Sequence, residues 1–325
     1  MKRRKSLKAI VACACMLSLP HWAGAQDAWP AKPVKIIAPV APGGGVDLVA
    51  RTMGDRLGKA LGQTFFVDNQ SGGGGIIASQ AVARSAPDGY TLLLGYVGTH
   101  GTNPAVRKLP YDAINGFTPI GMVGGTPNVL VVTPSLPVKS LKEFIAYLKA
   151  NPDKVSYGSS GQGTLTHLVM EQLKEATKTS MAHAPYRGIG PAIIDVLGGQ
   201  TQAMFPGLAA ALPYIKSGRM RPLAVTGTTR HRLLPDVPTM EELGFKGFDG
   251  VQWYGIMGPA NMPKPIVMRL NAEINRALTM PELREKLSGE ALETMPMSPE
   301  QFAAYIKSDI DKWSRLVKSR NIEIE

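Results

Sequence analysis

Short apolar runs recur along most of the chain, and segments with the apolar spacing of amphipathic helices separate them. Val46, Val49, Ala50 and Met53 follow this helical spacing and predict a helix over 46–61. The runs that predict strands are 34–39, 64–67, 91–94, 129–132, 155–158, 203–205, 223–225 and 253–257. Such alternation is typical of α/β proteins, in which helices flank mostly parallel sheets.

Two proline-marked stretches, 109–119 and 234–239, interrupt this alternation. They predict a discontinuous domain 1 (residues 26–125 and 246–325) and an inserted domain 2 (residues 126–245), each a mostly parallel sheet flanked by helices. Capping-box spacing predicts three further helix starts, at Ser140 to Glu143, Thr239 to Glu242 and Ser298 to Gln301.

Two glycine-rich loops, 40–45 and 69–75, each join a predicted strand to a predicted helix. Loops without Cβ atoms let a ligand approach the backbone, and the following helix N-terminus adds unpaired N–H donors and partial positive charge. A single glycine run is often only a tight turn, but repetition of the pattern favours an anion-binding role. Asp47, in the first helical turn, is a candidate ligand group, although a cap or dipole partner is more typical there.

Two further loops of the same character, 157–164 and 185–191, lie in the middle segment. Hydroxyl groups and a bidentate Arg are suited to carboxylate oxygens. The candidate side chains are Ser159, Ser160, Thr164, Tyr186 and Arg187. Two loops per domain, facing each other across a cleft, would make a closing binding site, although Arg187 could instead pair with a surface acid.

Three histidines differ in how well their positions suit a binding site. Thr99 and His100 follow a predicted strand end, where ligands bind in parallel sheets, and both are therefore candidates. His167 and His183 are more typical of satisfied core or surface histidines than of catalytic bases.

The first 25 residues have the regions of a secretory signal peptide. A basic start precedes an apolar stretch, 9–19, that is too short to span a bilayer, and Ala23–Ala25 is a cleavage motif. Both cysteines lie in this segment, so cleavage leaves no disulfide or thiolate metal site. We therefore expect the protein in the periplasm.

The charge and the motifs of the chain argue against several classes of function. Five basic residues and no acidic residue precede the cleavage site, so the formal charge falls from +11 to +6. The excess is scattered and does not favour nucleic-acid binding. The first two loops lack a P-loop ending, the dinucleotide fingerprint at 73–78 lacks its acidic partner, and 158–161 is too short for a nucleophile elbow. No histidine pair has metal-ligand spacing, so we predict no cofactor and no metal.

Eight motifs follow one another along nearly the whole mature chain, at 30–35, 39–47, 67–69, 87–92, 109–112, 185–188, 198–200 and 234–239. In this order they resemble the tripartite tricarboxylate transporter receptor proteins, the Bug family. The resemblance implies a periplasmic receptor of the type II binding-protein fold, whose two α/β domains close on a small carboxylate. It also implies a membrane permease as partner.

By position in that family, the candidate backbone contacts are Ala41, Pro42, Gly43 and Gly44 in the first loop and Gly73 and Gly74 in the second. Many members have an acidic residue after the Met-Phe of a later strand, where this chain has Pro206. Because such an acid can pair with a ligand ammonium, its absence favours a di-, tri- or aromatic carboxylate over an amino acid.

We therefore predict a monomeric, non-catalytic receptor that delivers a carboxylate to a permease. Two alternatives remain open. One is an exported enzyme that uses His100 or His167 as a base beside a serine. The other is a receptor that signals to a sensor kinase, and it would use the same binding site.

Overall fold

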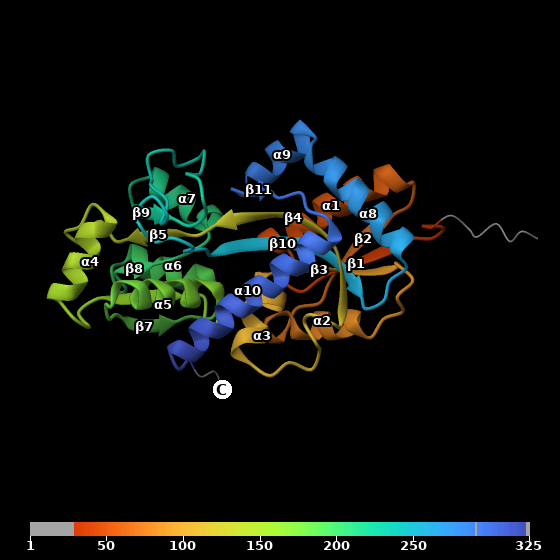
Figure 1. The fold of residues 1–325 in the computed structure, drawn as a ribbon. Helices are drawn as coiled ribbons and strands as arrows, with labels where there is room; N and C mark the ends of the chain where they lie inside the picture. The colour runs from red at the N-terminus through yellow and green to blue at the C-terminus, as the bar shows by residue number, and fades with distance from the viewer. Residues whose placement is uncertain (1–28, 290, 323–325) are drawn as a thin grey trace, which may run out of the picture.

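The apolar runs form two β-sheets, one in each of two lobes (Figure 1). The computed structural model describes residues 29–289 and 291–322, so the predicted signal peptide lies outside the described residues. The first lobe contains a sheet with the strand order β11-β4-β10-β3-β1-β2. Its strands are β1 (Val34–Ala38), β2 (Phe65–Asn69), β3 (Thr91–Tyr96), β4 (Phe117–Pro127), β10 (Val251–Pro259) and β11 (Glu293–Thr294).

The second lobe contains a sheet with the order β7-β6-β8-β5-β9. Its strands are β5 (Val129–Val132), β6 (Ser156–Ser159), β7 (Ala182–Pro185), β8 (Ala203–Met204) and β9 (Arg221–Val225). Every predicted strand is present, with ends shifted by one or two residues, whereas β4, β7 and β11 were not predicted. The exact domain boundaries stay a prediction.

Helices flank both sheets, and their apolar residues face inward. In α1 (Gly45–Leu61) the buried residues include Val46, Val49, Ala50 and Met53, as the helical spacing predicted. The other helices are α2 (Ile76–Ala83), α3 (Asn103–Val106), α4 (Leu141–Ala150), α5 (Leu165–Thr177), α6 (Ile189–Leu197), α7 (Leu208–Lys216), α8 (Lys264–Leu278), α9 (Pro281–Ser288) and α10 (Pro299–Ser319). None of the described helices is both long and apolar enough to cross a membrane.

The strand directions correct the expectation of mostly parallel sheets. β1 is parallel to β2 and β3, but β10 is antiparallel to β3 and β4. Likewise β6 is parallel to β7 and β8, but β5 is antiparallel to β8 and β9. The α/β class is confirmed, but both sheets are mixed. The reason is that β10 and β5 arrive directly from the other lobe, whereas a parallel neighbour needs a crossover connection.

Two of the three predicted helix starts are confirmed. Ser140 caps α4 and Ser298 caps α10, each through a side-chain hydrogen bond. The third is wrong, because Thr239 and Glu242 exchange both capping-box hydrogen bonds but only a turn follows. Gly244, at φ 95°, ends that turn in the left-handed conformation before a helix can propagate.

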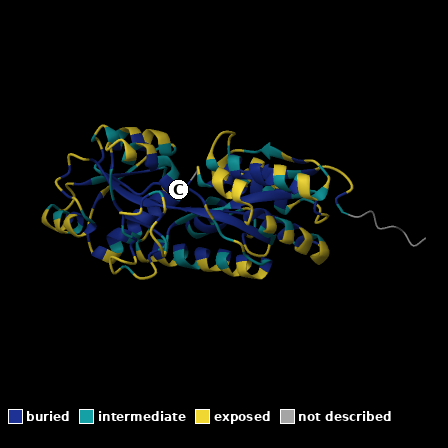
Figure 2. Cartoon of the chain, turned by 90° about the horizontal axis from the view of Figure 1, so that it is seen from above, coloured by how far each residue is buried: buried dark blue, intermediate teal, exposed yellow. Residues whose placement is uncertain are grey.

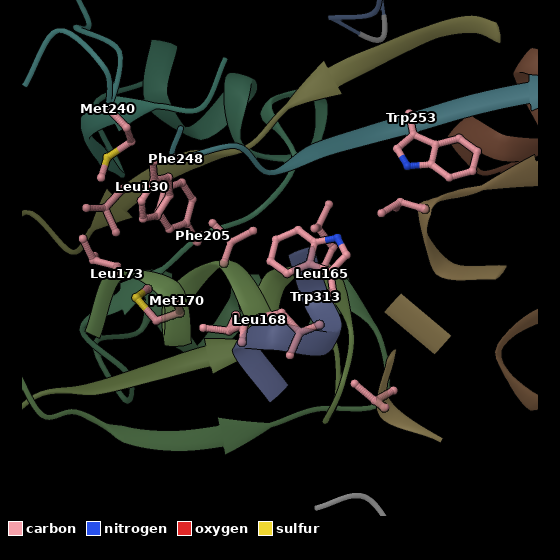
Figure 3. Close-up of a cluster of buried hydrophobic side chains, with 14 of the residues drawn as sticks. Leu130, Leu165, Leu168, Met170, Leu173, Phe205, Met240, Phe248, Trp253 and Trp313 are labelled. Carbon is pink, nitrogen blue, oxygen red and sulfur yellow. The ribbon is translucent and has the colours of Figure 1, made fainter. Parts of the chain in front are cut away.

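The two lobes share one of the buried apolar clusters. It contains Trp253 of β10, Trp313 of α10 and Leu168 of α5, among others. Figure 3 shows Trp313 beside the leucines of α5, and Figure 2 shows that the buried residues follow the two sheets while the outer helix faces are exposed. A core that continues between the lobes sets how the loops of one lobe lie relative to those of the other.

Candidate functional site

The carboxyl ends of three strands in the first sheet point toward the second lobe. The carbonyl of Gly250, just before β10, accepts a hydrogen bond from Thr226 Oγ1 of the second lobe (2.8 Å), so the amino end of β10 lies at the junction. β3 is antiparallel to β10, with Tyr96 opposite Tyr254, and therefore ends at the junction. β1 and β2 run in the same direction as β3 and end there as well.

The second sheet has the matching arrangement. β5 starts at Val129, directly after β4 crosses between the lobes (Figure 1). β8 is antiparallel to β5, and the bridge between Asn128 and Gly207 places the end of β8 at the junction. β6 and β7 are parallel to β8 and end on the same side. The loops after six strands, three from each sheet, therefore meet between the lobes, where α/β sheets bind ligands.

Four helices that begin at this junction have a glycine at the N-cap position and no side-chain cap, namely α1 (Gly44), α2 (Gly75), α6 (Gly188) and α7 (Gly207). By contrast, α4 and α10 have serine caps. The N–H groups in the first turn of an uncapped helix have no acceptor within the helix, and the helix N-terminus carries a partial positive charge. The four helix N-termini can therefore donate hydrogen bonds to an anion.

The first loop is held by the buried carboxylate of Asp47. Its Oδ2 accepts hydrogen bonds from the Gly43 N–H and from Arg51 Nε, both at 3.0 Å, and its Oδ1 accepts one from Asn69 Nδ2 at 2.8 Å. Burial raises the pKa of Asp47, but hydrogen bonds from Arg51, Gly43 and Asn69 outweigh it and hold the pKa below its usual value. Because its oxygens are occupied, Asp47 anchors the loop.

The second loop depends on glycines in the left-handed region. Gly74 and Gly75 have φ values of 67° and 91°. A Cβ on Gly75 would lie 2.6 Å from Thr99 Cγ2 and 3.1 Å from Pro39 Cβ, so only glycine lets the loop pack against the ends of β1 and β3. Asn103 Nδ2 donates a hydrogen bond to the Gly74 carbonyl (3.0 Å) and fixes the loop from the other side.

Thr99 and His100 are both fully buried beneath this loop. Thr99 Oγ1 bonds to the backbone of Tyr96 and lies 2.9 Å from His100 Nδ1. The His100 ring packs edge-on against Phe117, with centroids 4.4 Å apart. Burial lowers the pKa of His100 to about 3, so the ring is neutral. Both side chains support the loop from inside.

The loop after β6 makes most of its hydrogen bonds within itself. The Ser160 N–H donates to Thr166 Oγ1 (2.9 Å), the Gly161 N–H donates to Ser159 Oγ (3.2 Å), and Thr164 Oγ1 donates to the Gly161 carbonyl (2.7 Å). Ser159 is fully buried, whereas Ser160 and Thr164 are half-buried. The hydrogen bonds fix the backbone, and of the three candidate side chains in this loop Ser160 and Thr164 are nearer to the surface than Ser159.

Two histidines hold the ends of the same loop. His183 Nε2 lies 2.7 Å from Ser159 Oγ, and His167 Nδ1 accepts a hydrogen bond from the Gly163 N–H (3.1 Å). The two imidazole rings stack 4.1 Å apart, and the Tyr157 ring stacks on His183 at 4.8 Å. Burial lowers the pKa of each histidine to about 4. The sequence favoured a core or surface role for both histidines, but it did not indicate their stack with Tyr157, because β7, which carries His183, was not predicted.

The loop after β7 contains Arg187, the one arginine or lysine among the candidate site residues. The Tyr186 N–H donates to the Ser159 carbonyl (3.1 Å), and Tyr186 Oη donates to Asp195 of α6, so this tyrosine is held in place. Arg187 is exposed, and within the described residues its guanidinium has no hydrogen-bond or ion-pair partner. It is therefore available to a negatively charged ligand.

The structure separates the candidates into two groups. Those exposed or half-buried at the junction are Ala41, Pro42, Gly43, Gly44, Gly73, Gly74, Ser160, Thr164, Tyr186 and Arg187. Those buried behind the loops are Asp47, Thr99, His100 and Ser159. Ligand contact stays a prediction for every one of them, but burial and hydrogen bonding give the second group a supporting role. Sequence reasoning placed Gly188 in a candidate loop but missed the N-cap glycine Gly207, although a glycine soon after the apolar run 203–205 was the available signal.

The fold and the junction are those of a two-lobed solute-binding protein, and the comparisons with known proteins agree. Residues 49–322 match the model of the tripartite tricarboxylate transporter family receptor. Protein BugT of Bordetella pertussis is 35% identical over 305 residues, which cover 92% of each chain. The chain belongs to the tripartite tricarboxylate transporter receptor family, as its motifs suggested.

Solved structures confirm the periplasmic binding protein fold. The periplasmic binding protein BugD is 34% identical, with a TM-score of 0.76 over 91% of this chain and 100% of that one. An R. palustris protein with adipate is 34% identical, with a TM-score of 0.80 over 91% and 99%. MatC from Rhodopseudomonas palustris, with bound malate, is 32% identical, with a TM-score of 0.76 over 89% and 100%.

Proposed function

We propose that this periplasmic receptor captures a small organic carboxylate between its lobes and delivers it to a membrane permease. The observation that carries the proposal is the set of four uncapped helix N-termini at the junction, two from each lobe. A carboxylate supplies both the acceptor oxygens and the negative charge that such helix ends require. The related structures solved with adipate and with malate support this ligand class.

The charges at the junction favour a ligand with two acidic groups. The first-lobe N–H groups would bind one carboxylate, and Arg187 would bind the second in bidentate geometry. Asp47 is paired with Arg51, so it offers no free charge to a ligand ammonium. The segment after β8, Phe205 to Gly207, contains no acid either. We therefore expect dicarboxylates, aliphatic or aromatic, to bind more tightly than amino acids.

A micromolar dissociation constant is within reach of this site. It corresponds to about −8 kcal/mol. Hydrogen bonds to charged groups contribute roughly 1.5–3 kcal/mol each, so four or five of them would supply about 6–15 kcal/mol before desolvation and closure are subtracted, a range that includes this value.

The Ser159–His183 pair is the feature that could favour the enzyme alternative. Catalysis by a serine needs an accessible hydroxyl and a base that a third group orients. Ser159 is fully buried, and its oxygen also accepts the Gly161 N–H. Among the described residues, no carboxylate hydrogen-bonds the His183 ring. These observations support a structural role for the pair and a receptor without catalysis.

The experiment that tests the proposal starts from protein freed of ligand by unfolding and refolding. Thermal shift and calorimetry with adipate, malate and phthalate should show saturable binding, whereas adipamide, which lacks charge, and glutamate, which carries an ammonium, should bind weakly or not at all. No response to any carboxylate would refute the proposal. Conversion of a bound carboxylate to a product would favour the enzyme.

Delivery to a permease is a separate part of the proposal. Crosslinking in membranes from cells that express the loaded receptor should recover a transporter subunit of the tripartite type. Recovery of a sensor kinase instead would favour the signalling alternative. Light scattering of the loaded and empty receptor should give the mass of a monomer.

A further inference from the structure

The C-terminal helix joins the two lobes. The first half of α10 packs on the first lobe, where Asp309 accepts a hydrogen bond from Trp253 Nε1 (2.8 Å) and Phe302 packs edge-on against the same indole. The second half reaches α5 of the second lobe, as Figure 1 shows. There Arg320 and Ser319 hydrogen-bond to Glu171 and Glu175. The end of α10 therefore carries polar contacts from one lobe to the other.

Glu171 is the centre of these contacts and is itself buried, with 6% of its surface exposed. Arg320 donates to its Oε2 from Nε (3.1 Å) and Nη2 (2.9 Å), and Lys174 and Tyr157 donate to its Oε1, each at 2.6 Å. Burial raises the pKa of Glu171, but hydrogen bonds from Lys174, Tyr157 and Arg320 outweigh it and lower the pKa overall. The carboxylate is stable in the interior because all of these partners are in place.

From Glu171 the contacts continue to the junction loop. The Tyr157 hydroxyl that binds Glu171 belongs to the ring that stacks on His183. His183 and His167, stacked on each other, hold Ser159 and Gly163 at the two ends of the loop after β6. A continuous set of hydrogen bonds and stacked rings thus runs from the end of α10 to that loop.

We infer that Arg320 is a positioning residue for the loop after β6. It lies in the terminal turn of a helix anchored on the first lobe, touches no candidate ligand group, and orients Glu171 and, through it, Tyr157 and the two histidines. The loop conformation that binds a ligand is then maintained only while α10 rests against α5. The role of this loop in carboxylate binding rests on the proposed function above.

The first test needs no ligand. Hydrogen exchange of the Gly161 and Gly163 amides is measured in wild type, Arg320→Gln, Arg320→Lys and Lys318→Gln. Lys318 is exposed in the same turn and carries the same charge, and within the described residues it has no hydrogen-bond or ion-pair partner. We expect R320Q to accelerate exchange at the two amides about tenfold, R320K to restore most of the protection, and K318Q to behave as wild type.

Amides of α4, in the same lobe, serve as the internal control. A purely structural role of Arg320 would accelerate exchange in α4 as much as in the loop, and that result overturns the inference. Equal exchange in R320Q and K318Q overturns it as well.

The second test measures affinity for adipate and malate. R320Q should raise the dissociation constant about five- to tenfold and K318Q should leave it unchanged. An unchanged constant in R320Q, despite faster exchange, overturns the link to binding. If wild type binds neither probe, the proposed function fails for these ligands, while the exchange measurement still decides whether Arg320 positions the loop.

Discussion

The imidazole rings of His167 and His183 lie 4.1 Å apart and nearly parallel, with an angle of 9° between their planes. The two residues come from α5 and β7, and each holds one end of the same junction loop. Neutral rings can stack at this distance, whereas two imidazolium ions would repel each other in a site with little water. The geometry therefore favours the neutral forms.

This contact predicts how stability depends on pH. In the folded protein the pKa of both histidines is about 4, below the ordinary value of 6.5, because of burial. The unfolded chain therefore binds more protons as pH falls below 6.5, and stability is full above 6.5 and lost as pH falls toward 4. Each histidine should contribute a slope of roughly 1 kcal/mol per pH unit near pH 5.

Thermal denaturation between pH 7.5 and 4.5 measures this slope. His183→Asn should lower the Tm at every pH and make its decline with acid shallower than in wild type. Parallel curves for the two proteins would show that His183 does not titrate in this way.

Asp47→Asn should weaken both the fold and ligand binding. The amide cannot pair with Arg51 and loses an acceptor for the first loop, which leaves the Gly43 N–H or Asn69 without a partner. We expect a loss of about 1–3 kcal/mol in the free energy of unfolding, measured with urea. Asp55→Asn is the matched control, because Asp55 lies on the exposed side of α1 and, within the described residues, forms its ion pair with Lys59 alone. It should cost less than about 1 kcal/mol.

Arg187→Gln should remove discrimination between one and two acidic groups. If Arg187 binds the second carboxylate, wild type should prefer adipate to hexanoate, and the variant should bind both with similar affinity, about tenfold weaker for adipate. Calorimetry with both ligands measures the change. Lys216→Gln, which removes an exposed charge from α7 of the same lobe, should leave the preference intact. An equal loss for the two ligands would contradict the assignment of Arg187.

Gly75→Ala separates a steric effect from backbone strain. Its new Cβ would collide with Thr99 and Pro39, so the second loop must move away from the ends of β1 and β3. Gly62→Ala, at φ 71° with no atom within 4 Å of its Cβ, adds backbone strain alone. We expect G62A to cost about 1 kcal/mol in unfolding free energy and G75A clearly more, with loss of carboxylate binding only in G75A. Similar values for both would show that the close packing of Gly75 against Thr99 and Pro39 is unimportant.

The hydrophobic pattern predicted the strands that are short continuous apolar runs. It missed β4, β7 and β11, whose sequences do not form such runs. The proline-marked stretch 109–119 was interpreted as a break and no strand was predicted after it until 129, yet 117–127 is the longest strand of the first sheet. A Cβ on Gly124 or Gly125 would collide with the neighbouring β11 or with Val251, so the glycines permit close packing. Strand propensity cannot predict this close packing, because the residues that contact the two glycines, in β11 and at Val251, are distant in sequence.

The candidate site was likewise predicted only in part from the sequence. Loop composition and helix spacing placed Gly43 and Gly74 after predicted strands and Arg187 before a predicted helix, and the structure brings the three loops to one junction. The sequence could not show that Asp47 and Ser159 are occupied by internal hydrogen bonds, because those depend on packing between elements. The Tyr157–His183–His167 stack was equally hidden, since it joins two strands and a helix.

Capture of a dicarboxylate between the two lobes is the central claim, and a crystal structure of the protein grown with adipate tests it most directly. We expect one carboxylate within hydrogen-bond distance of N–H groups in the first two glycine loops, and the other against Arg187, with both lobes in contact with the ligand. Adipate bound to one lobe alone, or outside the junction, would contradict the account.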